Sequence, residues 1–211
     1  MKKFELTNEF ITNMFGTKLF RIRALVEFGD VEAGELGGYV EKESNLGHDD
    51  NAWVYDNAWV YGDAQVSGDA RVYGNARVYD NAWVYGNAQV SGNARVYGDA
   101  RVCGNALVYD NAWVYDNAWV YGNAQVSGDA QVFGDARVSG DKDYAYAHGF
   151  GSCNRTTTFF RLKDGDVGVR CGCFYGTLAQ FRDKVCETHG ETKKAQEYLM
   201  LADLMEIRFK N

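Results

Sequence analysis

The sequence predicts a mainly β protein whose central part coils along one axis, with a β cap before the coil and a small α+β unit after it. Three observations lead to this fold class: a six-residue repeat, abundant glycine without proline, and a change of composition on both sides of the repeat. Internal repetition of this kind determines the architecture before any local motif does.

The repeat runs through residues 51–141 without an insertion. Alanine recurs every six residues from Ala52 to Ala136, which makes 15 hexads, and valine follows two residues after each alanine. In Ala-x-Val the two small apolar side chains lie on one face of a short strand, and x lies on the other. The next residues form a corner, because Gly, Asn and Asp tolerate positive φ. A chain that repeats strand and corner in this way must coil around an interior of alanine and valine.

The composition agrees with such a coil. The chain has no proline, where average usage gives about ten, and proline would remove N–H groups needed to pair each coil with the next. The 24 glycines occur together with 14 tyrosines and 5 tryptophans, an aromatic content that excludes a disordered chain.

Units such as Val60-Tyr61-Gly62-Asp63-Ala64-Gln65 resemble the hexapeptide repeat of left-handed parallel β-helices. That family places an aliphatic residue at one position and a small residue four positions later. The resemblance implies three hexads per coil, hence about five coils that each rise about 4.8 Å along the axis. Every third hexad then stacks, which predicts one aromatic corner ladder and two outward ladders of alternating aromatic and basic residues. These are Tyr61, Tyr79, Tyr97, Tyr115 and Phe133; Trp59, Arg77, Arg95, Trp113 and Gln131; and Gln65, Trp83, Arg101, Trp119 and Arg137.

Residues 1–50 are predicted to be the N-terminal cap and entry coil. The alternation in Leu19–Val26 indicates a strand, Gly34–Val40 is a turn-rich entry, and Leu46 suggests an imperfect first hexad. A solenoid needs such a cap because an open end would expose apolar side chains and unpaired strand edges.

Residues 142–211 are predicted to form a C-terminal α+β domain. Its elements are, in order, a strand at Thr156–Leu162, a turn at Lys163–Asp166, a strand at Val167–Cys171, a helix from Leu178 to about Thr188 with Thr177 as N-cap, and a helix from Ala195 to about Phe209.

The order of segments also resembles uncharacterised hexapeptide-repeat proteins of bacteriophages and prophages. These proteins combine a Leu-Gly-Gly entry, here Leu36–Gly38, with the C-terminal segments seen here as Thr156–Phe160 and Cys171–Phe174. They have no established chemistry, so the resemblance implies a context and not an activity.

The segment from Gly149 to Thr158 looks most like a binding site, because it combines glycine turns, hydroxyl groups and an arginine suited to an anion such as phosphate. Arg155 and Arg170 are expected near opposite ends of the hairpin's open side. The same residues could also form an ordinary loop that leads into a strand. The candidate ligand-binding residues are Ser152, Asn154, Arg155, Thr156, Thr157, Thr158 and Arg170.

Two further chemistries receive less support. Hexapeptide-repeat acyltransferases usually use a histidine base, but His48, His148 and His189 all lie outside the hexads and no loop interrupts them. Zinc could be held by Cys153, Cys171, Cys173, Cys186 and His189, but the Cys-x-Cys spacing is tight, and buried reduced thiols are the favoured interpretation. No catalytic residue, metal or cofactor is therefore predicted.

The charge balance favours a cytoplasmic binding protein without nucleic acid or membrane partners. With 22 basic and 29 acidic residues the net charge is −7, no run of about 18 apolar residues occurs, and the N-terminus lacks a signal peptide. Five cysteines, an odd number, fit reduced thiols. We expect a homotrimeric, non-catalytic scaffold, in a host cell if phage-encoded. It would present a C-terminal recognition domain to a nucleotide-like anion or to a host defence protein. The alternative is an acyltransferase acting on a sugar or nucleotide-sugar.

Overall fold

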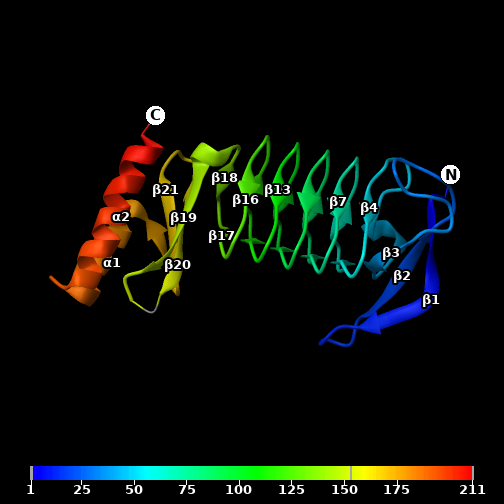
Figure 1. The fold of residues 1–211 in the computed structure, drawn as a ribbon, viewed down its shortest axis with the longest axis horizontal. Coiled ribbons are helices and arrows are strands. Elements are labelled where there is room, and N and C mark those ends of the chain that lie inside the picture. The colour runs from blue at the N-terminus through cyan, green and yellow to red at the C-terminus, as the bar shows by residue number, and fades with distance from the viewer. Residues whose placement is uncertain (1, 153, 211) are drawn as a thin grey trace.

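A computed structural model describes residues 2–152 and 154–210, and it confirms the predicted fold class. Figure 1 shows a parallel β-solenoid in the middle of an elongated molecule, with a strand hairpin at the N-terminal end and a sheet covered by two helices at the C-terminal end. The described part of the chain contains no helix long and apolar enough to cross a membrane.

The solenoid is built from two-residue strands that stack on three faces. Each strand pairs in parallel with the strand 18 residues later, as in Val60↔Val78 and Val78↔Val96, so three hexads make one turn. The first face has the order β5-β8-β11-β14-β17, the second β6-β9-β12-β15-β18, and the third β4-β7-β10-β13-β16. The strands are β4 (Trp53–Val54), β5 (Trp59–Val60), β6 (Gln65–Val66), β7 (Arg71–Val72), β8 (Arg77–Val78), β9 (Trp83–Val84), β10 (Gln89–Val90), β11 (Arg95–Val96), β12 (Arg101–Val102), β13 (Leu107–Val108), β14 (Trp113–Val114), β15 (Trp119–Val120), β16 (Gln125–Val126), β17 (Gln131–Val132) and β18 (Arg137–Val138).

The interior contains the alanines and valines that the repeat predicts. Each of them from Ala52 to Val138 is at most 1% exposed. At the corners the chain adopts positive φ, for example 68° at Gly62 and 52° at Asp56. A Cβ at Gly62 would lie 3.0 Å from the Asp80 backbone nitrogen, so a side chain there would be tightly packed against the next coil and would also hold an unfavourable positive φ.

The predicted ladders are confirmed. Rings of the corner ladder from Tyr61 to Phe133 stack at 4.8–5.0 Å with interplanar angles of at most 11°. On the outward faces guanidinium groups lie over indole rings, at 4.2 Å for Arg77 over Trp59 and 5.8 Å for Arg137 over Trp119.

The coil begins before the regular hexads and has about six turns instead of five. Strand β3 (Leu36–Val40) pairs in parallel with β5, and Leu46 bridges Val66. Both contacts join residues that are 20 apart in the chain, whereas the regular turns join residues 18 apart. The entry turn therefore contains two extra residues and does not show the hexad spacing. Leu46 therefore does occupy an imperfect first unit, as predicted.

The N-terminal cap extends the first face. Strands β1 (Phe4–Thr12) and β2 (Lys18–Ala24) are antiparallel to one another, and β2 is antiparallel to β3. The resulting sheet has eight strands in the order β1-β2-β3-β5-β8-β11-β14-β17. Phe4, stacked at 4.4 Å on His48 and packed edgewise on Trp53, closes the open end of the coil.

The C-terminal module is an antiparallel sheet between the solenoid and two helices. A short 3-10 helix, η2 (Asp141–Asp143), leads into it, and the sheet order is β19-β20-β21-β22. The predicted hairpin and both helices are confirmed, whereas β19 and β22 were not predicted. The elements are β19 (Tyr144–Phe150), β20 (Arg155–Arg161), β21 (Val167–Cys171), β22 (Phe174–Thr177), α1 (Leu178–His189) and α2 (Lys193–Phe209).

Candidate functional site

Two of the predicted ligand contacts are buried inside the module. Thr157 and Thr158 are each 1% exposed. Thr158 Oγ1 accepts a hydrogen bond from the Gln131 N–H on the solenoid side of the sheet, while Thr157 Oγ1 donates to Cys171 Sγ on the helix side. Both hydroxyls are bonded inside the protein and closed to solvent, so the structure gives their predicted contact with a ligand no support.

The two predicted arginines lie on opposite faces of the sheet. Arg170 pairs with Thr158, its guanidinium lies 5.2 Å from the Phe133 ring, and its Nε donates to Gln131 Oε1, all toward the solenoid. Arg155 is exposed on the helix side and lines a small cavity there. The expectation that they share an open side is wrong, because the solenoid end covers one face of the hairpin and the helices cover the other.

The cavity beside Arg155 measures about 180 Å³, which is small for an organic ligand but large enough for an inorganic anion. The guanidinium packs on the turn at Gly172, where a Cβ would lie 2.1 Å from Nη1. Ser152, Lys184, His189 and Tyr198 line the same cavity. Burial raises the pKa of the Tyr198 phenol above its usual value, the hydrogen bond from Cys171 Sγ acts in the same direction, and hydrogen bonds with Ser152 oppose them.

The remaining predicted residues do not enter this cavity. Asn154 is exposed with φ of 46°, and Thr156 Oγ1 lies 2.9 Å from His148 Nδ1 on the neighbouring strand. Of the seven predicted residues, only Ser152 and Arg155 line this cavity, while Thr158 and Arg170 are neighbours on the solenoid side of the sheet.

The cysteines do not form a metal centre in the described residues. No group of three or more histidine, cysteine or acidic side chains there is placed to hold an ion. Cys173 and Cys186 are exposed thiols, so the expectation of burial is wrong for both, and Cys153 lies outside the described residues.

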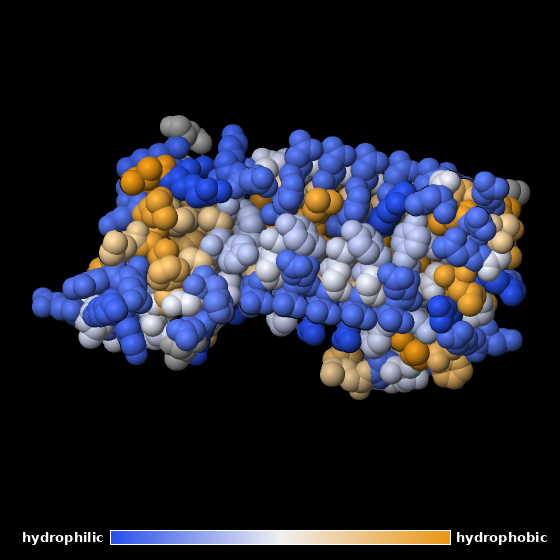
Figure 2. Space-filling view, viewed as in Figure 1, coloured by the Kyte–Doolittle hydropathy of each residue, from blue (hydrophilic) through white to orange (hydrophobic). Residues whose placement is uncertain are grey.

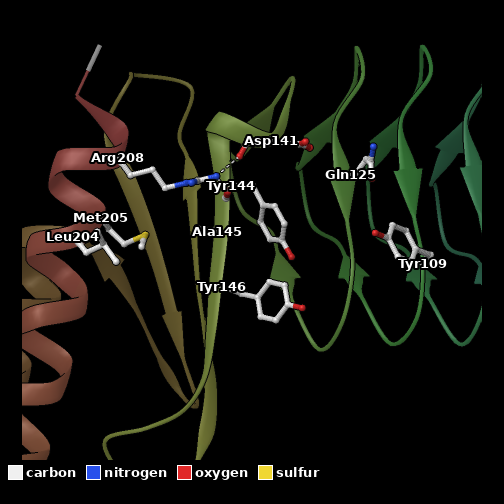
Figure 3. Close-up of a pocket in the computed structure, with 9 residues that line it drawn as sticks. All are labelled: Tyr109, Gln125, Asp141, Tyr144, Ala145, Tyr146, Leu204, Met205 and Arg208. Atoms are coloured by element: carbon white, nitrogen blue, oxygen red, sulfur yellow. Dashed lines mark hydrogen bonds between the residues drawn. The ribbon is translucent and has the colours of Figure 1, made fainter.

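The module also has a groove that sequence reasoning missed. It measures about 510 Å³ and lies where α2, β19 and the last coils meet, as Figure 3 shows. The sequence does contain a signal for the strand that lines this groove. Tyrosine and alanine alternate at 144–147, a pattern typical of a strand with one aromatic face. The lining residues are Tyr109, Gln125, Asp141, Tyr144, Ala145, Tyr146, Leu204, Met205 and Arg208.

Hydrogen bonds fix both walls of this groove. The buried Tyr144 hydroxyl donates to the Ser127 carbonyl at 3.1 Å, and burial raises the pKa of that phenol, so it stays protonated at neutral pH. Arg208 Nη2 donates to the carbonyls of Asp141 and Tyr144, at 2.7 and 3.3 Å, which ties α2 to the start of β19. The groove is therefore a preformed surface.

An exposed apolar surface adjoins the groove. On α2, Met200, Leu204 and Ile207 are 71%, 55% and 70% exposed, and their spacing places them along one stripe of the helix. Tyr146 and Phe150 on β19 are each 44% exposed. In Figure 2 hydrophobic colour gathers over this end of the molecule, while the edge of the coil is hydrophilic.

The architecture defines a β-solenoid repeat protein. Five segments, residues 64–79, 70–86, 88–104, 100–116 and 112–128, match the family model described as the YdcK beta solenoid repeat. No curated protein matches the chain. The matched segments all lie in the coil, so the similarity concerns the solenoid and does not extend to either end module.

Proposed function

We propose that this chain is a non-catalytic binding protein whose rigid solenoid presents the C-terminal groove to an extended segment of a partner protein. One observation carries the proposal: β19 is the edge strand of its sheet and lines a groove with apolar side chains on both sides. An edge strand offers backbone N–H and C=O groups that a partner segment can pair with as an added strand, here beyond the Tyr144 carbonyl, which Arg208 already occupies.

The two sides of β19 would recognise alternate side chains of that segment. Tyr144 and Tyr146 point toward the solenoid, where a Cβ at Gly128 would lie 2.8 Å from the Tyr146 hydroxyl. Ala145 packs on the helix-side core, and its small side chain leaves the space beside Leu204 open. The best ligand is thus an extended peptide with apolar residues at alternate positions.

The wider context of the proposal comes from the sequence. The six-residue units support a left-handed hexapeptide-repeat coil, and the resemblance to phage and prophage proteins makes a host defence protein in the cytoplasm the partner we favour. Outward tryptophans on two faces, Trp59 and Trp113 on the first and Trp83 and Trp119 on the second, support a homotrimer, since burial of such surface stabilises by about 25 cal/mol per Å². Sedimentation that gives only monomer at micromolar concentration would contradict the trimer.

The docking proposal is tested by capture from a bacterial lysate, reconstitution with the purified partner, and hydrogen exchange on the complex. We expect slower exchange of β19 amides in the complex, and weaker binding by about tenfold or more in Tyr146→Ser and Leu204→Asp. Gln196→Asp, an exposed position on the same helix, is the matched control and should bind normally. Protection confined to the coil, or unchanged affinity in both variants, would refute the proposal.

A second candidate is an anion site at Arg155. It is favoured by the Arg155 guanidinium, which has no hydrogen-bonded carboxylate among the described residues and lines a cavity; Lys184 lines the same cavity but pairs with Glu187 at 2.8 Å. Inorganic phosphate should then bind, and Arg155→Ala should abolish that binding without changing the melting temperature. Phosphate binding that is absent, or that survives the substitution, excludes this site.

The alternative of acyl transfer would require a base near a solenoid face. The hexads contain no histidine, and His48, His148 and His189 lie in the entry turn, on β19 and at the end of α1. These positions give the alternative less support than the groove gives to protein binding.

A further inference from the structure

A second cleft lies at the opposite end of the molecule, between the tip of the β1–β2 hairpin and the first solenoid face. It measures about 330 Å³. Figures 1 and 2 show the hairpin projecting from the coil near the N-terminus, with its tip beside the solenoid. Asn13, Met14 and Phe15 form the hairpin wall, and the other wall consists of Trp59, Tyr61, Arg77, Tyr79 and Arg95.

Two arginines in this cleft are direct neighbours with no opposite charge. Arg77 and Arg95 are paired positions on β8 and β11, so their side chains leave the same face one strand apart. Each is stacked on an indole, Arg77 over Trp59 and Arg95 over Trp113, and neither forms an ion pair among the described residues. Like charges directly opposite one another on adjacent strands destabilise a sheet.

The other faces of the coil avoid this juxtaposition. On the second face Trp119 separates Arg101 from Arg137. On the third face Arg71 is neutralised by a salt bridge of 2.9 Å to Asp30. The adjacent pair therefore marks the one stretch of the described hexads where two basic side chains meet without an aromatic ring or a carboxylate between them.

No acidic side chain lines the cleft. Asp80 lies at the corner beside Tyr79, but its carboxylate accepts a hydrogen bond from the Gly98 N–H. Met14 and Phe15 are 87% and 80% exposed, so a ligand in the cleft would also remove apolar surface of the hairpin tip from water.

We infer that this cleft binds a small anion that carries an aromatic ring, such as a nucleoside monophosphate. The guanidinium pair provides the fork-shaped donors that phosphate oxygens accept, and the anion relieves the repulsion between the two charges. The ring would stack between the hairpin tip and the aromatic wall of Trp59 and Tyr61. The cleft volume lies at the lower end of the range for small-molecule sites. This site is independent of the protein-binding groove and lies at the other end of the coil.

The test is titration of the purified protein with the four ribonucleoside monophosphates, with adenosine, and with inorganic phosphate, followed by calorimetry and tryptophan fluorescence. At least one nucleotide should bind saturably and change the fluorescence, while adenosine and phosphate alone bind more weakly. Arg77→Gln and Arg95→Gln should each weaken nucleotide binding by about tenfold or more, since each removes a charged hydrogen-bond donor. Phe15→Ser should weaken it by a smaller factor.

Arg101→Gln is the matched control. Its guanidinium lies 5.6 Å from the Trp83 ring on the second face and does not line the cleft, so the substitution should leave affinity unchanged. Three outcomes would overturn the inference: no saturable nucleotide binding, equal loss in the control and in the Arg77 and Arg95 variants, or phosphate binding as tight as nucleotide binding.

Discussion

The solenoid and the C-terminal module use their strands in different ways. From β5 to β16 each strand of the coil turns its valine inward and its other residue outward, so one face is core and the other is at least partly exposed. Strand β20 is covered on both sides: Phe160 belongs to the core of the coil, and Phe159 to the core under the helices. A one-sided strand leaves a regular row of side chains for interactions, whereas a two-sided strand leaves only its ends and the edge of its sheet.

This difference explains where the candidate sites lie. On the coil the exposed cleft uses outward positions of β5, β8 and β11. In the module the larger groove uses the edge strand β19 and Leu204, Met205 and Arg208 of α2, because the inner strands have no free face.

The largest expected effect is on the core of the coil. Ala94 is fully buried in an interior of alanine and valine, so Ala94→Leu should overpack it and lower the free energy of unfolding by about 1–3 kcal/mol. The measurement is urea denaturation. Gln125→Leu is the control, because Leu107 already occupies the same outward position on the paired strand. Equal midpoints for Ala94→Leu and the unaltered protein would mean that the interior is not close-packed there.

The inward and outward positions of the coil could be predicted almost residue by residue, because the six-residue spacing of alanine determines them. The position of alanine fixes which side chains point inward, and the count of three hexads per turn fixes which ones stack. An entry coil within residues 1–50 was predicted, but the pairing of β3 with β5 was not, because two extra residues in this turn remove the 18-residue repeat signal. The aromatic and basic ladders could be predicted from the same spacing. The cleft beside the β1–β2 hairpin could not, since no local sequence pattern places the hairpin tip next to the first solenoid face.

The predicted C-terminal site failed for a related reason. The strand at Thr156–Leu162 and its turn could be recognised locally, but a hairpin does not tell which of its faces stays free. That depends on the docking of the sheet on the last coil, through contacts such as Phe160 with Phe133 at 5.7 Å. Arg155 could be recognised as an exposed cation, while Arg170 was misplaced because its partner Gln131 lies 39 residues away.

The next prediction compares how much Arg170 and Arg155 contribute to the free energy of unfolding. Arg170 stacks on Phe133 and donates to Gln131, so Arg170→Ala should lower the free energy of unfolding by roughly 1–2 kcal/mol. Arg155 makes no such contact with the coil, and Arg155→Ala should change it by less than about 0.5 kcal/mol. Chemical denaturation of both variants provides the measurement. If Arg155→Ala is the more damaging substitution, the assignment of the two faces is wrong.

The smallest effect concerns the tyrosine ladder, a feature that only the regular coil can build. Burial between stacked rings, with the neighbouring Tyr61 adding to it, raises the pKa of Tyr79 to about 12. A phenol whose pKa is raised by folding contributes stability that is complete below its unfolded value near 10 and is lost as the pH rises through its folded value. The protein should therefore become easier to denature between about pH 8 and about pH 11, as ionised tyrosines accumulate in the unfolded chain.

Tyr79→Phe separates this effect from general alkaline damage. Phe133 already holds the last position of the same ladder, so a ring without a hydroxyl fits the stack. The variant should match the parent protein at about pH 8 and lose less stability by about pH 11, because one raised phenol is missing. Urea midpoints at the two pH values, together with tyrosinate absorbance during alkaline titration, measure the difference. Parallel losses in parent and variant would show that the buried ladder does not resist ionisation, and the aromatic corner would then be only a packing feature.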